Sequence, residues 1–126
     1  MTNEKQRVGL RGRKLHGKLL MFQLDALDSE LRARAKDAAQ GLASRTLVKQ
    51  GTLRITQVAL RKGAALESHH VAGSISIQVL RGTLRLTTEE GDMDMAAGSL
   101  ATLAAGVVHA ARGLNNCALL LTISLP

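Results

Sequence analysis

The stretch "GAALESHHVAGSISIQVLRG", residues 63–82, combines a strand pattern with a pair of adjacent histidines. Ile75, Ile77 and Val79 alternate with other residues, which is the period expected of a β-strand with one buried face. Glycines stand at both ends of the stretch, where short strands need sharp turns. The stretch therefore predicts a fold of short strands and turns, and the placing of its histidines decides which chemistry it carries.

The same pattern continues on both sides of this stretch. "RITQVAL" precedes it, and "TLRLTTEEGDMDMAAG", "SLATLAAGVVHAARG" and "NCALLLTISL" follow it, each bounded by glycine or by polar turn residues. About seven or eight short strands with regular turn signals predict an antiparallel sandwich or barrel. A jelly roll is the natural closure, so we expect an all-β antiparallel jelly-roll barrel.

One helix is expected before the strands, over about residues 28–40. Its apolar positions recur at helical spacing and form one narrow stripe, made of Leu27, Leu31, Ala35 and Ala38. Gly41 follows as a left-handed cap that ends the helix. The short apolar run over residues 18–24 is expected to pair as an edge strand.

Charge divides the chain into a tail and a domain. Residues 1–18 hold six Lys or Arg residues against Glu4 alone, a net charge of +5 out of +7 for the whole chain. We interpret residues 1–18 as a disordered basic tail and residues 19–126 as a single domain. A basic tail suits phosphate backbones or acidic partners, but the chain has one Phe and neither Tyr nor Trp, which argues against base stacking on nucleic acid.

Two further features concern the compartment. Cys117 is the only cysteine, which excludes an intramolecular disulfide and favours a reducing, cytoplasmic location. No apolar run has the length needed to span a membrane.

Two segments resemble the paired motifs of the cupin superfamily. The first runs Gly63–(five residues)–His69–x–Val71–(three)–Ile75–(six)–Gly82. The second runs Gly98–(five)–Ala104–x–Gly106–(two)–His109–(three)–Gly113. The resemblance covers about residues 46–124 and implies a small, single-domain cupin barrel.

The resemblance also implies a metal site, but this sequence departs from the cupin pattern at two of the ligand positions. The cupin pattern places three histidines and one carboxylate around Fe, Mn, Ni or Zn. His69 and His109 match two ligand positions, whereas Val71 and Ile75 stand at the positions of the second histidine and the carboxylate. A bulge that turns His70 inward would give a His69–His70–His109 cluster able to hold a divalent metal. Without it, His69 and His109 line an apolar cavity.

Three functions remain open at this point. The favoured one is a small-molecule-binding module with little or no catalysis, whose pocket is lined by His69, Ile75, Ile77, Val79 and His109. The first alternative is a metal-dependent enzyme of dioxygenase or isomerase type that uses His69, His70 and His109. The second is binding of nucleic acid or an acidic partner through residues 5–18. We also expect a homodimer, because strands such as "SISIQVL" leave apolar surface or an edge to cover.

Overall fold

The computed structural model describes residues 14–126, and residues 1–13 of the predicted basic tail lie outside the described residues. Within residues 14–126, helix α2 (Leu24–Asp37) precedes nine strands, one more than the upper number expected. The strands are β1 Leu42–Gln50, β2 Leu53–Leu60, β3 Ala65–His69, β4 Ser74–Arg81, β5 Thr83–Thr88, β6 Gly91–Ala96, β7 Leu100–Leu103, β8 His109–Gly113 and β9 Cys117–Ser124. No helix of this described part is long and apolar enough to cross a membrane.

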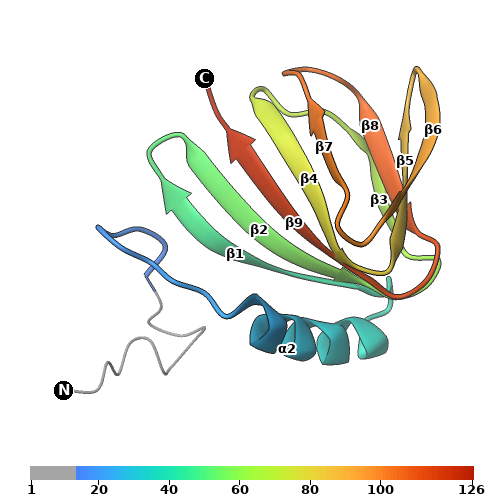
Figure 1. Ribbon diagram of the computed structural model, residues 1–126, viewed down its shortest axis with the longest axis horizontal. Coiled ribbons are helices and arrows are strands. Elements are labelled where there is room, and N and C mark those ends of the chain that lie inside the picture. The colour runs from blue at the N-terminus through green and yellow to red at the C-terminus, as the bar shows by residue number, and fades with distance from the viewer. Residues whose placement is uncertain (1–13) are drawn as a thin grey trace.

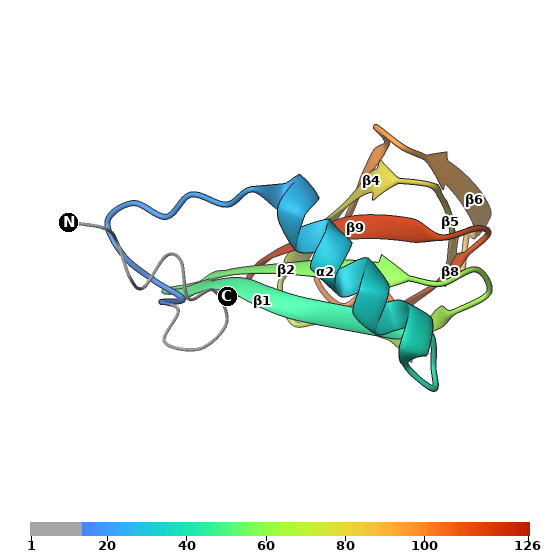
Figure 2. The ribbon, with the colours of Figure 1, turned by 90° about the horizontal axis from the view of Figure 1, so that it is seen from below.

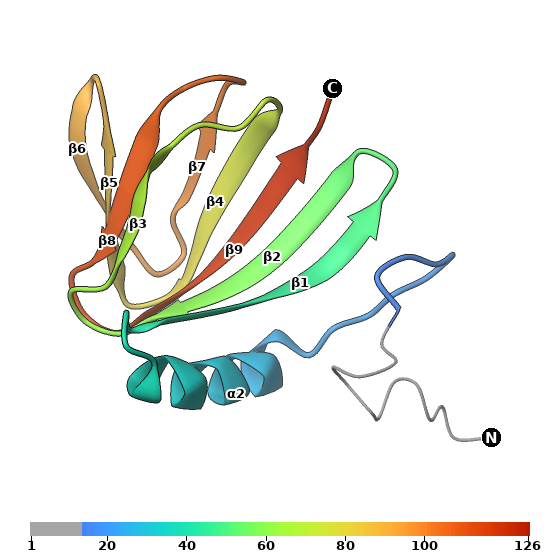
Figure 3. The same cartoon turned by 180° about the vertical axis from the view of Figure 1, so that it is seen from behind.

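The strands form two antiparallel sheets that face each other. One sheet has the order β1-β2-β9-β4-β7 and the other the order β3-β8-β5-β6. Figure 1 shows β1, β2, β9 and β4 side by side at the left, and β5, β6 and β8 of the second sheet at the right. Figure 3 shows β3 and β8 from the other side of the molecule. The antiparallel all-β prediction is confirmed, and the closure of the two sheets into one barrel stays a prediction.

The space between the sheets is filled by apolar side chains from alternate positions of the strands. Val79 and Leu119 lie opposite each other in neighbouring strands and are fully buried, as is Leu84 of the second sheet. The buried cluster comprises Val58, Leu60, Ala64, Ile75, Ile77, Val79, Leu84, Leu86, Met95, Ala111, Cys117 and Leu119. The core therefore lies between the sheets and is built from aliphatic residues, as the composition requires.

Helix α2 covers the outer face of the five-stranded sheet, and Figure 2 shows it crossing β1 and β2. Leu31 and Ala35 pack on Ala43 and Ala59, two small residues that let the helix approach the strands. Polar contacts add to this small apolar cluster. The Arg81 guanidinium donates two hydrogen bonds to the buried Asp28 carboxylate, at 2.9 and 3.2 Å.

The helix begins and ends about one turn earlier than the sequence pattern predicted. Its first residue, Leu24, has a carbonyl that accepts a hydrogen bond from the Gln57 side chain of β2, at 2.9 Å. At the other end Ala38 is already extended, and Gly41 has φ of +70° in the turn that leads into β1. Gly41 thus belongs to the reversal of the chain, four residues after the last residue of the helix.

The edge strand expected over residues 18–24 is not formed. Residues 19–23 have no strand structure, and Leu24 is already helical. The segment just before them contacts the edge of β1 instead, where the Leu15 carbonyl accepts from the Lys49 amide at 2.8 Å. The prediction was wrong because Leu15 and Gly17 already make the contacts with the end of β1, through Lys49 and Gln50, and the chain then continues to the start of α2 at Leu24.

Candidate functional site

Two histidines from different strands are brought into contact at one end of the second sheet. His69 ends β3, His109 begins β8, and they are direct partners in the strand register. Their ring centroids are 4.4 Å apart and the ring planes are tilted by 55°. His109 is buried with 4% exposure, whereas His69 is exposed. The two histidines at the ligand positions of the sequence motifs, His69 and His109, therefore lie in contact in the fold.

The hydrogen bonds of the two rings define their tautomers. His69 Nδ1 lies 2.8 Å from the Glu67 carbonyl, and His109 Nδ1 lies 3.0 Å from the Val107 carbonyl. A carbonyl oxygen can only accept, so each Nδ1 carries the hydrogen and donates it. In the neutral ring this leaves Nε2 with a free lone pair. Each histidine consequently offers one acceptor nitrogen.

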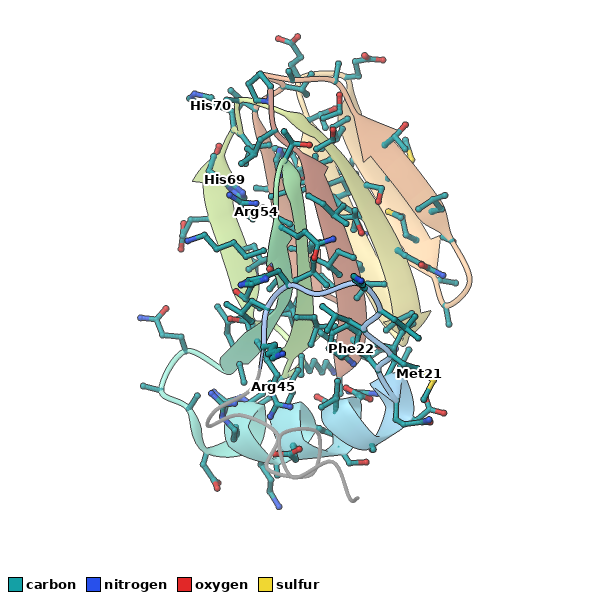
Figure 4. The ribbon with its side chains drawn as sticks, turned by 90° about the vertical axis from the view of Figure 1, so that its left-hand side faces the viewer. Met21, Phe22, Arg45, Arg54, His69 and His70 are labelled. Carbon is teal, nitrogen blue, oxygen red and sulfur yellow. The ribbon has the colours of Figure 1, made fainter. Side chains whose placement is uncertain are left out.

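His70 does not join this pair. It is exposed, and Figure 4 shows it apart from His69 and pointing outward. A register irregularity does occur in β3, between Leu66 and His69, but it lies before His69 and leaves His70 beyond the end of the strand. Over residues 14–126 no group of three or more His, Cys, Asp or Glu side chains is placed to hold a metal ion.

The apolar residues expected to line a pocket lie in the core. Ile75, Ile77 and Val79 are 4%, 3% and 0% exposed and belong to the cluster between the sheets. Their shared face, predicted from the alternation, is confirmed. Whether they also contact a ligand stays a prediction.

A groove of about 730 Å³ lies at the end of the second sheet, where β5 and β8 separate. Thr87 and Ala110 are the last partners of these two strands, and beyond them the chain diverges into the β5–β6 turn and the β7–β8 loop. The groove is lined by Ser68, Thr87, Thr88, Glu89, Ala105, Gly106, Val107, Val108, His109 and Ala110. The buried His109 thus borders open space on one side.

Carboxylates dominate the charge beside the groove. Glu89 lines it, and Asp92 and Asp94 follow on β6. The Arg85 guanidinium donates to Asp94 at 2.8 Å and holds the pKa of that carboxyl below its ordinary value. Asp92 accepts a hydrogen bond from the Thr87 hydroxyl at 2.7 Å.

Most residues of the groove were not identified from the sequence. Thr87, Thr88 and Glu89 belong to the strand expected before the Glu90–Gly91–Asp92 turn, and Val107 and Val108 to the strand expected after Ala105–Gly106. The groove forms where the pairing of β5 with β8 stops. That position depends on the register between two strands far apart in the sequence, which no local pattern predicts. The one local signal was the position of His109, three residues after Gly106 in the second motif.

No protein-family model matches the chain, and no curated protein matches it in sequence. Solved structures do match its fold. A cupin superfamily protein from Desulfitobacterium hafniense has a TM-score of 0.66 at 16% identity, over 68% of this chain and 78% of that one. A conserved protein of unknown function from Streptococcus pyogenes has a TM-score of 0.69 at 22% identity, over 90% of this chain and 93% of that one.

An enzyme is also among the structures with a similar fold. Salicylate 1,2-dioxygenase from Pseudoaminobacter salicylatoxidans has a TM-score of 0.72 at 18% identity, and the match covers 82% of this chain but 32% of the dioxygenase. At such identities the likeness concerns the fold alone. Together with the two facing sheets, these matches show that the chain has the cupin fold.

Proposed function

We propose that this protein binds a small organic molecule in the groove beside His109 and that it does so with little or no catalysis. The observation that carries the proposal is a groove of about 730 Å³ that is bordered by the buried His109 and lined by both apolar and polar residues. Small-molecule sites have volumes of this order and combine apolar walls with a few directed polar groups. Val107, Val108 and Ala110 supply such walls here.

The test is a titration of the isotope-labelled full chain with a defined collection of small fragments, followed by amide chemical shifts. Fragments are expected to shift the amides of Thr88 and Ala110. Ala110→Leu fills the groove and is expected to abolish these shifts. Ala96→Leu places the same side chain at an exposed position of β6, outside the groove, and is expected to leave them unchanged. A collection that leaves the groove amides of the unmodified protein unmoved would refute the proposal.

A metal-dependent enzyme is the alternative that the fold family suggests. The residues present do not fit a centre of three histidines and a carboxylate, because Val71 and Ile75 are apolar and His70 lies apart from the histidine pair. Two imidazoles can bind Zn²⁺ or Ni²⁺ only weakly without further ligands. We therefore place the metal alternative second.

Elemental analysis of the purified protein separates the two. The proposal expects transition metal well below one atom per chain. A stoichiometric metal that disappears in His109→Ala would establish the metal alternative and remove the metal-free proposal.

We further propose the cytosol as the compartment, because Cys117 is a free, buried thiol. Binding of nucleic acid through residues 5–18 concerns a segment that lies mostly outside the described residues. It has a direct test, since salt-dependent DNA binding would be lost when residues 1–18 are deleted.

A further inference from the structure

We propose that the groove beside His109 selects small organic cations, above all primary amines, and rejects carboxylates of the same size. This inference rests on the proposed binding function and names the chemical class of its ligand. It follows from the hydrogen-bonding capacity left free on the groove walls and from the charge around them.

Of the five polar side chains that line the groove, Thr87, Glu89 and His109 offer hydrogen-bond acceptors. His109 donates through Nδ1 to Val107 and keeps the Nε2 lone pair. The Thr87 hydroxyl gives its hydrogen to Asp92, so only its lone pairs remain for a ligand. Glu89 carries a carboxylate, which accepts at both oxygens. A ligand that meets any one of these groups has to bring a hydrogen of its own.

Two backbone donors that an anion would need are occupied, although the Ser68 and Thr88 hydroxyls of the wall can donate. In the β7–β8 loop the Gly106 amide donates to the Val71 carbonyl at 2.9 Å, and the Val107 amide donates to the Ala104 carbonyl at 3.2 Å. These two N–H groups are therefore unavailable as an anion-binding nest. The Thr88 hydroxyl accepts from the Glu90 amide at 3.1 Å and retains its own hydrogen, which makes it a donor on the wall.

Charge favours the same class of ligand. Among the described residues that line the groove none is Lys or Arg, whereas Glu89 is one of them. Glu90 and Asp92 stand next to it in the same hairpin, and of the hairpin carboxylates Asp94 is the one neutralised by Arg85. The groove is thus an acidic site on a chain of net charge +7. A cation gains from this local field and an anion does not.

Three probes with one carbon skeleton separate the classes: butylammonium, butan-1-ol and butyrate. Each is titrated at low, constant ionic strength into the full chain, and the amides of Thr88 and Ala110 are followed by NMR. Butylammonium is expected to bind most tightly, butan-1-ol more weakly, and butyrate not measurably. The butyl chain is the same in all three, so its contact with Val107 and Val108 cancels from the comparison.

The matched variants are Glu89→Gln in the groove and Glu90→Gln beside it, both at exposed positions. Glu89→Gln is expected to weaken butylammonium roughly threefold, the size of an exposed charge contact. Glu90→Gln removes the same charge from the hairpin without removing a groove residue, and a smaller loss is expected.

Tighter binding of butyrate than of butylammonium would overturn the inference while leaving the binding function intact. Equal effects of the two variants would overturn it as well, since only the general charge of the hairpin would then matter. Failure of all three probes to move the groove amides also refutes it. In that case the fragment titration still decides the binding function separately.

Discussion

Arg45 carries its charge beneath α2, where its side chain is 2% exposed. Its Nη2 donates to Glu30 at 3.1 Å, but its Nε and Nη1 have no hydrogen-bond partner within residues 14–126. Gln57 of β2 is the cross-strand partner of Arg45, and its Oε1 is also buried without a hydrogen-bond partner among the described residues. Figure 4 shows Arg45 between the strands and the helix. Two free donors beside one free acceptor are what a single bridging water satisfies, so we expect an ordered water there.

The dependence of Arg45 on Glu30 gives a stability prediction. Glu30→Gln leaves a buried guanidinium without its counter-charge, and we expect a loss of about 2 kcal/mol in the free energy of unfolding by urea denaturation. Glu90→Gln, at an exposed position without a side-chain hydrogen bond to a described residue, serves as the control. Arg45→Met removes the charge itself and is expected to cost less than Glu30→Gln. The reverse order would show that the buried ion pair is not what limits stability here.

Cys117 gives a prediction about pH. Burial raises the pKa of its thiol to about 11. The unfolded thiol ionises near its ordinary value of roughly 8.5–9, so the unfolded state releases its proton first as the pH rises. The stability from this group is therefore complete below about pH 8.5 and is lost between there and pH 11.

Denaturation at pH 7.5 and pH 10 measures this loss. The unmodified protein is expected to lose roughly 1.5 kcal/mol more over that interval than Cys117→Ala, in which the titrating group is gone. Identical pH dependence in the two proteins would mean that the thiol ionises alike in the folded and unfolded states.

At the scale of the elements, two motif glycines with similar backbone angles are used differently. Gly63 has φ of +84° and Gly82 has φ of +78°, a region that other residues enter at a cost. A Cβ at Gly63 would meet nothing within 4 Å, whereas one at Gly82 would collide with the carbonyl oxygen of Asn116. Gly82 therefore lets the β4–β5 connection approach the β8–β9 loop, in addition to making a turn.

The two alanine variants separate these roles. Gly63→Ala is expected to cost about 1 kcal/mol of unfolding free energy, the penalty of the left-handed conformation. Gly82→Ala carries the same penalty and also forces backbone apart, so we expect it to cost at least about 2 kcal/mol more, measured by urea denaturation. Equal losses would show that the loop moves aside freely.

The same elements show which features a sequence can predict. The face shared by Ile75, Ile77 and Val79 followed from alternation within β4, and α2 followed from its apolar stripe, because both are local patterns. The position of His70 depended on a bulge in β3, which no local pattern fixes. The groove depended on Thr87 and Ala110 being the last pair of two strands far apart in sequence. Motif spacing identified His69 and His109 but not the residues around them.

At the scale of the whole molecule, apolar side chains are exposed just before α2. Leu19 is 86% exposed and Met21 is 78% exposed, and both belong to a segment without strand or helix structure. Leu19 and Met21 lie two residues apart, and exposed apolar side chains that lie together are typical of surfaces that contact another protein. We propose that this segment contacts a second copy of the chain.

Light scattering coupled to size exclusion tests the dimer at micromolar concentration, where the unmodified protein is expected to elute at twice the mass of one chain. Leu19→Ser combined with Met21→Ser removes the apolar contact, and this variant is expected to elute as a monomer. Met93→Ser is the control, because Met93 is 60% exposed on β6, in the other sheet, and its loss should leave the dimer intact. A monomeric unmodified protein would exclude the dimer altogether. A dimer that survives the double variant but not Met93→Ser would move the interface to the second sheet, beside the groove, and would make ligand binding and association compete for the same surface.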